Sequence, residues 1–175
     1  MGDRLVEDSV LKGKEIMISA CLLGIRCRYD GRHSICPDLV DFLVSYHFTP
    51  FCPEQIGGLP TPRPAANMIG GDGMDILSGS ARLVDSRGKD VTSAFERGAQ
   101  EALRLARLAA SPIAIMKVRS PSCGLKTPYC DKPGGTGIGV TAALFKSEGI
   151  KIIELDANDD FPNPEFFQAI KLMNS

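Results

Sequence analysis

Four short apolar runs, each of a length typical of a buried strand, are separated by segments in which apolar residues recur at helical spacing. The runs cover residues 15–20, 47–52, 112–118 and 150–155. The intervening pattern predicts helices over 36–46 and 90–110, a loop leading into a helix over 137–149, and a last helix over 163–173. Because strands alternate with helices, we expect an α/β, three-layer Rossmann-like fold with a mainly parallel sheet and helices on both faces.

Glycine and proline interrupt this alternation between residues 54 and 79, which we expect to form a long loop. The following segment, 80–92, resembles a small hairpin turning at Arg87 and Gly88. Residues 1–12 are predicted to be an N-terminal arm, and residues 13–175 a single domain. The chain is long enough to bury a full core without help from disulfides or metals.

Composition excludes several function classes. The net charge is −1 and the lysines and arginines are scattered, so the sequence shows no basic surface for nucleic acid. Tryptophan is absent, and no apolar run has the length of a membrane span. The first residues also lack the apolar core of a signal peptide. We therefore expect a cytoplasmic protein.

Cysteines carry the candidate chemistry. In a reducing compartment, metal ligation or catalysis is a better interpretation of cysteines than disulfide bonding. Three of them, Cys21, Cys52 and Cys123, each follow a predicted strand, so they converge if those strands are parallel neighbours. The sequence has no C-x-x-C pair and does not indicate a zinc ribbon. The six cysteines are Cys21, Cys27, Cys36, Cys52, Cys123 and Cys130.

Three convergent thiolates are typical of a soft metal centre such as an iron–sulfur cluster. A fourth ligand would come from Cys27 or Cys130, or one iron would stay open to substrate. The residues alone leave other interpretations standing: cysteines packed as small apolar residues, a non-catalytic iron–sulfur redox or carrier protein, or a structural zinc module. A metal-free thiol enzyme ranks last, because neither His33 nor His47 lies in a motif that would pair it with a thiol.

Four longer motifs point to a family. They are SACLLGIRCRYDG (Ser19–Gly31), FCPEQIGGLPTPRPAANMIGGDG (Phe51–Gly73), GKDVTSAFERGAQEAL (Gly88–Leu103) and MKVRSPSCG (Met116–Gly124). With these motifs, the chain from Ile16 to Ile153 resembles the DUF523 family, which includes the thiouracil desulfidases. The resemblance implies a [4Fe–4S] cluster held by Cys21, Cys52 and Cys123, with one iron free for the substrate sulfur. It also implies a small thiolated nucleobase or nucleoside, such as 2-thiouracil, that is hydrolysed to uracil and hydrogen sulfide.

Catalysis by hydrolysis needs a base for water. Glu54 lies two residues after a proposed ligand and is our candidate; the alternative is a carboxylate that braces a loop. Ser120 begins the turn that carries Cys123, and we expect it to bind substrate or relay a proton. Ser122 would instead brace that turn, and Asp30, in a Y-D-G turn, is a weaker acid–base candidate.

The remaining candidates have less specific signals. Arg63 and Arg119 would hold an anion or a pyrimidine carbonyl, unless they form salt bridges. Cys27 matches a familiar position of the family, but we assign it a supporting or packing role rather than ligation. Cys36 and Cys130 lie outside the strongest motifs and are interpreted as ordinary small residues.

Overall fold

A four-stranded parallel sheet forms the centre of the molecule in the computed structural model, which describes residues 15–172. The arm predicted over residues 1–12 lies outside the described residues, and the single-domain organisation stays a prediction. The strand order β2-β1-β5-β6 places β1 and β5 in the middle. All four predicted strands are therefore confirmed, with bounds β1 (Ile16–Ser19), β2 (Phe48–Phe51), β5 (Ile113–Lys117) and β6 (Lys151–Leu155).

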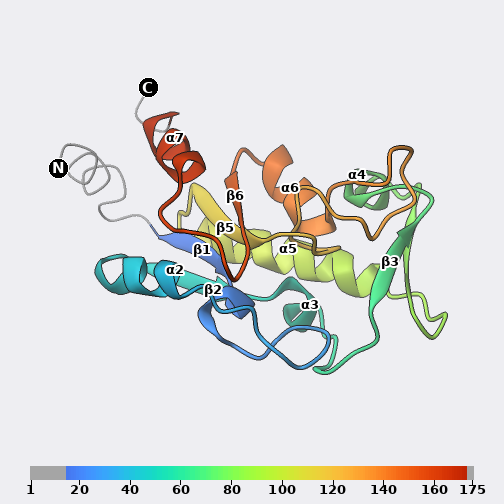
Figure 1. The fold of residues 1–175 in the computed structure, drawn as a ribbon. Helices are drawn as coiled ribbons and strands as arrows, with labels where there is room; N and C mark the ends of the chain where they lie inside the picture. The colour runs from blue at the N-terminus through green and yellow to red at the C-terminus, as the bar shows by residue number, and fades with distance from the viewer. Residues whose placement is uncertain (1–14, 173–175) are drawn as a thin grey trace.

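Helices cover both faces of this sheet (Figure 1). Successive side chains of a strand point to opposite faces, so Ile16 and Ile18 pack into one apolar core and Met17 into the other. The predicted three-layer fold is confirmed. The first face is covered by α2 (Pro37–Phe42) and α7 (Pro164–Leu172), and the second by α5 (Thr92–Leu108) and α6 (Val140–Ser147).

The prediction of a long loop over residues 54–79 is wrong, because this segment contains regular secondary structure. It holds most of α3 (Pro53–Ile56), the strand β3 (Ala66–Ile69) and α4 (Gly73–Leu77). The expected hairpin over 80–92 is confirmed in a short form. After a turn at residues 86–88 the chain returns along β4 (Arg82–Asp85), with an isolated antiparallel bridge between Val84 and Asp90. The strand β4 also pairs antiparallel with β3.

Two further differences are local. The helix predicted over 36–46 ends at Phe42 and continues as a short 3₁₀ turn, η2 (Leu43–Ser45). Another 3₁₀ turn, η1 (Ala20–Leu23), follows β1 directly. None of the helices in the described part of the chain combines the length and apolar character that crossing a bilayer requires.

Two glycines bring the short helix α3 into direct backbone contact with α5. A Cβ atom placed on Gly98 of α5 would lie 2.0 Å from the carbonyl oxygen of Pro53, and one on Gly57 would lie 2.1 Å from that of Ala94. Arg97 of α5 also donates to the Gly57 carbonyl from Nε and Nη2, at 3.0 and 2.6 Å. The segment that begins at Cys52 is therefore positioned by α5.

Replacing Gly98 with alanine should lower the free energy of unfolding by about 1–2 kcal/mol, because overpacking against backbone outweighs the better helix propensity of alanine. Urea denaturation measures the change. Gln100→Ala, at an exposed position of the same helix, is the matched control and should change stability by less than about 0.5 kcal/mol. A Gly98→Ala protein as stable as the wild type would contradict the close contact.

Candidate functional site

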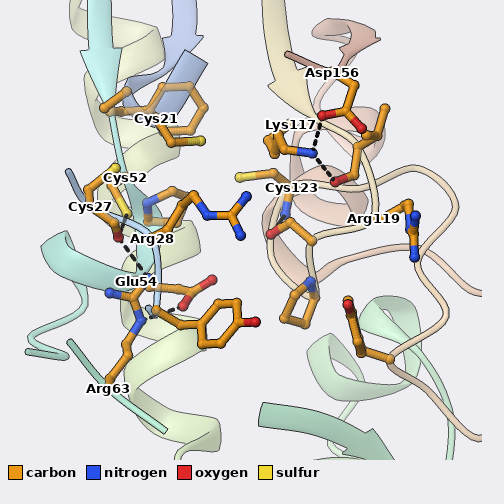
Figure 2. A pocket seen from close by; sticks show the side chains of 18 residues that line it. Cys21, Cys27, Arg28, Cys52, Glu54, Arg63, Lys117, Arg119, Cys123 and Asp156 are labelled. Carbon is orange, nitrogen blue, oxygen red and sulfur yellow. Dashed lines mark hydrogen bonds and ion pairs between the residues drawn. The ribbon is translucent and has the colours of Figure 1, made fainter. Parts of the chain in front are cut away.

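Three cysteines from three neighbouring strand ends line one cavity of about 320 Å³ (Figure 2). Cys21 lies in η1, immediately after β1, and Cys52 is the N-cap residue of α3, immediately after β2. Cys123 lies in the turn that follows β5. Because β2, β1 and β5 are adjacent and parallel, their carboxyl ends meet at the same edge of the sheet.

The turn that carries Cys123 is built around Ser120. The Ser120 hydroxyl oxygen accepts from the backbone N–H groups of Ser122 and Cys123, at 3.1 and 3.0 Å. The Gly124 N–H donates to the Ser120 carbonyl at 2.9 Å. A Cβ atom on Gly124 would lie 2.9 Å from the Ser120 nitrogen, so this close turn requires glycine.

A fourth cysteine, Cys27, also lines the cavity, and its thiol interacts with those of Cys21 and Cys52. The hydrogen bond with Cys21 raises the pKa of Cys27 to about 12, and burial adds to this effect. Hydrogen bonding to Cys27, together with burial, also raises the pKa of Cys52. Burial raises the pKa of Cys123 to about 12, although Ser19 and Ser120 donate hydrogen bonds to its sulfur.

These thiols are poor candidates for a metal-free nucleophile, because a reactive cysteine needs a lowered pKa. As a donor set they fit a thiolate-binding metal group, which displaces the thiol protons when it binds. In residues 15–172, no three cysteine, histidine or acidic side chains lie close enough together to hold a single metal ion. An iron–sulfur cluster is wider than one ion and fits thiols spread around the walls of a cavity.

Glu54 lines the same cavity and is held there by Arg63 (Figure 2). The Arg63 Nε lies 2.6 Å from Glu54 Oε2, and the two side chains are 5% and 14% exposed. Arg63 also donates to the carbonyl oxygens of Cys27 and Pro60 and to the Thr61 hydroxyl. Its donors are thus directed at the protein, and Arg63 is a salt-bridge partner rather than a group open to substrate.

The two serines of the Cys123 turn occupy different environments. Ser120 lines the cavity, whereas Ser122 is buried outside it and shares a 2.9 Å hydrogen bond with Thr141. Glu54 and Ser120 are therefore brought together with the proposed ligands, and Ser122 is not.

Comparison of the sequence with known proteins shows which family the chain belongs to. Residues 16–157 match the family described as 2-thiouracil desulfurase. The chain belongs to the 2-thiouracil desulfurase family. It is 40% identical over 148 residues to protein YbbK of Bacillus subtilis (strain 168), covering 82% of this chain and 98% of that protein. The predicted resemblance is confirmed.

A solved structure described as the [4Fe-4S]-dependent thiouracil desulfidase TudS, a DUF523 protein, shares the fold. It is 36% identical to this chain, with a TM-score of 0.73 over 91% of this chain and 99% of the solved one. The family match over residues 16–157 includes all three strand ends and the segments that follow them.

In this member of the 2-thiouracil desulfurase family, sequence reasoning missed several charged residues of the cavity. Lys117 is the last residue of β5, and its Nζ lies 2.8 Å from the Asp156 carboxylate, which follows β6. Burial works against a charged Asp156, but hydrogen bonds from Lys117 and a backbone N–H outweigh it and lower its pKa. Arg28 lines the cavity next to Cys27. Lys117 and Asp156 lie at the ends of predicted strands, as the cysteines do, and could have been predicted in the same way; Arg28 does not.

Other predicted candidates lie apart from the cavity or at its rim. Asp30 does not line it; hydrogen bonds from Arg28 and Arg32 hold the pKa of Asp30 well below its usual range, so it is corrected from acid–base candidate to counterion. Arg119 lines the cavity as an exposed residue with φ +58°. Cys36 and Cys130 lie outside the cavity, and their thiols donate to the carbonyl oxygens of Asp159 and Thr127.

Proposed function

We propose that this protein is an iron–sulfur-dependent desulfidase that hydrolyses a thiolated pyrimidine such as 2-thiouracil to uracil and hydrogen sulfide. The observation that carries the proposal is the meeting of Cys21, Cys52 and Cys123 in one cavity of a chain that belongs to the 2-thiouracil desulfurase family. A neighbour of the same fold is described as [4Fe-4S]-dependent, which supports the same group here.

The three cysteines would hold the cluster as thiolates. When bound through three cysteines, a [4Fe–4S] cluster leaves one iron open, which supplies a soft Lewis acid that prefers a thiocarbonyl sulfur to an oxygen donor. The overall reaction adds one water to the thiocarbonyl carbon and releases hydrogen sulfide, so it requires no net electron transfer. A cytoplasmic location and a small-molecule partner, not nucleic acid, belong to the same proposal.

The protein side chains would handle the water. Glu54 lines the cavity, and its pairing with Arg63 fixes one carboxylate oxygen, so the other is placed to accept a proton from the attacking water. The Ser120 hydroxyl oxygen accepts hydrogen bonds from two backbone N–H groups. The hydroxyl hydrogen is therefore left to be donated to the Cys123 sulfur or to the substrate. Ser120 therefore shapes the ligand turn as well as lining the cavity.

The test is an assay of anaerobically purified protein with 2-thiouracil in ¹⁸O-labelled water and without added reductant. We expect about four irons per chain, broad visible absorption, hydrosulfide release and one ¹⁸O atom in the product carbonyl. Protein from which iron has been removed by a chelator should be inactive and should recover activity after reconstitution. A requirement for stoichiometric reductant, or unlabelled uracil as product, would refute the hydrolytic reaction.

A closed cluster in a non-catalytic carrier is the second candidate, because the Cys27 thiol interacts with two of the proposed ligands. In that case the loaded protein would bind iron with four cysteines and release no hydrosulfide from 2-thiouracil. The same assay thus separates the two functions.

A further inference from the structure

Arg28 presents a cation to the cavity, and the chemistry proposed above does not use it. Its Nε and Nη2 donate to the two carboxylate oxygens of Asp30, at 3.2 and 3.0 Å, and its Nη1 donates to the Ser34 hydroxyl at 2.6 Å. The pair with Asp30 is bidentate, a geometry that fixes the plane of the guanidinium.

Asp30 is itself held in place. Its oxygens accept from the backbone N–H of Arg32 at 3.1 Å and from Arg32 Nε at 3.0 Å, and its side chain is 17% exposed. The guanidinium of Arg28 is therefore supported by a fixed anion rather than by a mobile surface carboxylate. Such support keeps a charged group in one orientation before any ligand arrives.

Arg119 is an exposed residue at the rim of the cavity, and the two other cations, Arg63 and Lys117, differ from Arg28 in what they face. Arg63 is almost fully buried and donates its hydrogen bonds to Glu54 and to backbone carbonyl oxygens. Lys117 is bound to Asp156 and to the Val118 carbonyl. The Arg28 side chain, by contrast, is 29% exposed, and Figure 2 shows its guanidinium between the wall that carries Cys27 and Cys52 and the wall that carries Cys123.

A guanidinium carries five N–H donors, and the bonds to Asp30 and Ser34 use three of them. One N–H on each terminal nitrogen is left, and both lie in the plane of the guanidinium. A flat heterocycle offers acceptors in its own plane. In 2-thiouracil, a ring nitrogen separates the thiocarbonyl carbon from a carbonyl carbon, so sulfur and oxygen lie along the same part of the ring edge.

The geometry points to Arg28 as the residue that orients the substrate: it donates to the carbonyl oxygen that one ring nitrogen separates from the thiocarbonyl carbon. This inference rests on the proposed function and adds a substrate class to it, thioamide heterocycles that carry such a carbonyl oxygen on the ring. The cation also favours the negative charge that develops as water adds to the thiocarbonyl carbon.

The experiment compares two substrates and three variants. Wild-type protein is assayed with 2-thiouracil and with pyrimidine-2-thione, which lacks the carbonyl oxygen, and a group built to bind that oxygen should favour 2-thiouracil by about 100-fold in kcat/KM. Arg28→Gln should lower kcat/KM for 2-thiouracil by about 100-fold and leave that for pyrimidine-2-thione nearly unchanged, so the preference disappears. Arg28→Lys should keep only part of the wild-type kcat/KM for 2-thiouracil, because lysine keeps the positive charge but lacks the planar set of donors of a guanidinium.

The matched control is Arg26→Gln, which removes the same charge from an exposed position of the same loop outside the cavity. It should keep the wild-type preference. Iron content and visible absorption should be unchanged in all variants, which separates loss of orientation from loss of the metal group. Binding of uracil, measured by calorimetry, gives a readout without turnover, and its Kd should rise about tenfold or more in Arg28→Gln.

The outcomes distinguish this inference from the proposed function. If the wild type desulfurates 2-thiouracil but Arg28→Gln retains both the substrate preference and the affinity for uracil, Arg28 does not orient the substrate. If the wild type desulfurates neither compound yet binds uracil in an Arg28-dependent way, the proposed function fails and the binding role of Arg28 stands.

Discussion

Replacing Cys123 with alanine is expected to abolish the visible absorption of the anaerobically loaded protein and its release of hydrosulfide together. Cys123 is one of three proposed ligands, and the two others lie on different strand ends, so none of them compensates for its loss. Iron analysis, the visible spectrum and a 2-thiouracil assay on the same preparation measure the effect. Cys21→Ala and Cys52→Ala should behave alike.

Cys36→Ala and Cys130→Ala are the matched controls, since both remove a thiol outside the cavity. Cys36 is fully buried, so its substitution costs some stability while the loaded protein keeps its spectrum. Loss of iron in the Cys36 or Cys130 variant, or its retention in the Cys123 variant, would contradict the ligand assignment. In Cys27→Ala we expect the absorption to remain, because three ligands are still present.

The central sheet could be predicted because its strands are mostly apolar and both middle strands are buried on both faces. The elements between residues 54 and 79 could not, because β3 has a single buried residue and α4 is only five residues long. The strand β3 depends on β4 for its hydrogen bonds, which no local pattern reveals. The helix α4 did leave a signal: Asp72 and Asp75 form a capping box at its N-terminus.

Some residues of the candidate site could likewise be placed from the sequence, and others could not. Cys21 and Cys52 could be placed because they follow β1 and β2 directly, so the strand order fixes where their side chains begin. Arg28 lies beyond η1 in an irregular segment, and its position depends on Asp30 and Ser34. Nothing in the local sequence gives the path of that segment, since it is set by side-chain contacts that only the folded structure brings together.

Replacing Arg63 with methionine is expected to lower the free energy of unfolding by about 3–5 kcal/mol, the cost of leaving a buried charge without its partner. Glu54 would keep its carboxylate in a site where its side chain is only 14% exposed, and the carbonyl oxygens of Cys27 and Pro60 would lose a donor. Urea denaturation gives the change. The matched control is Arg107→Met, which breaks the exposed pair with Glu148 and should cost less than about 1 kcal/mol.

A second substitution separates charge from packing. If the unpaired Glu54 carboxylate dominates the loss, Glu54→Gln in the Arg63→Met background should restore part of the stability, because it removes the uncompensated charge and keeps the shape. Glu54→Gln alone should abolish hydrolysis while the visible absorption stays, since Glu54 is the proposed base and not a ligand. An Arg63→Met protein no less stable than Arg107→Met would show that the buried pair does not hold the cavity wall together.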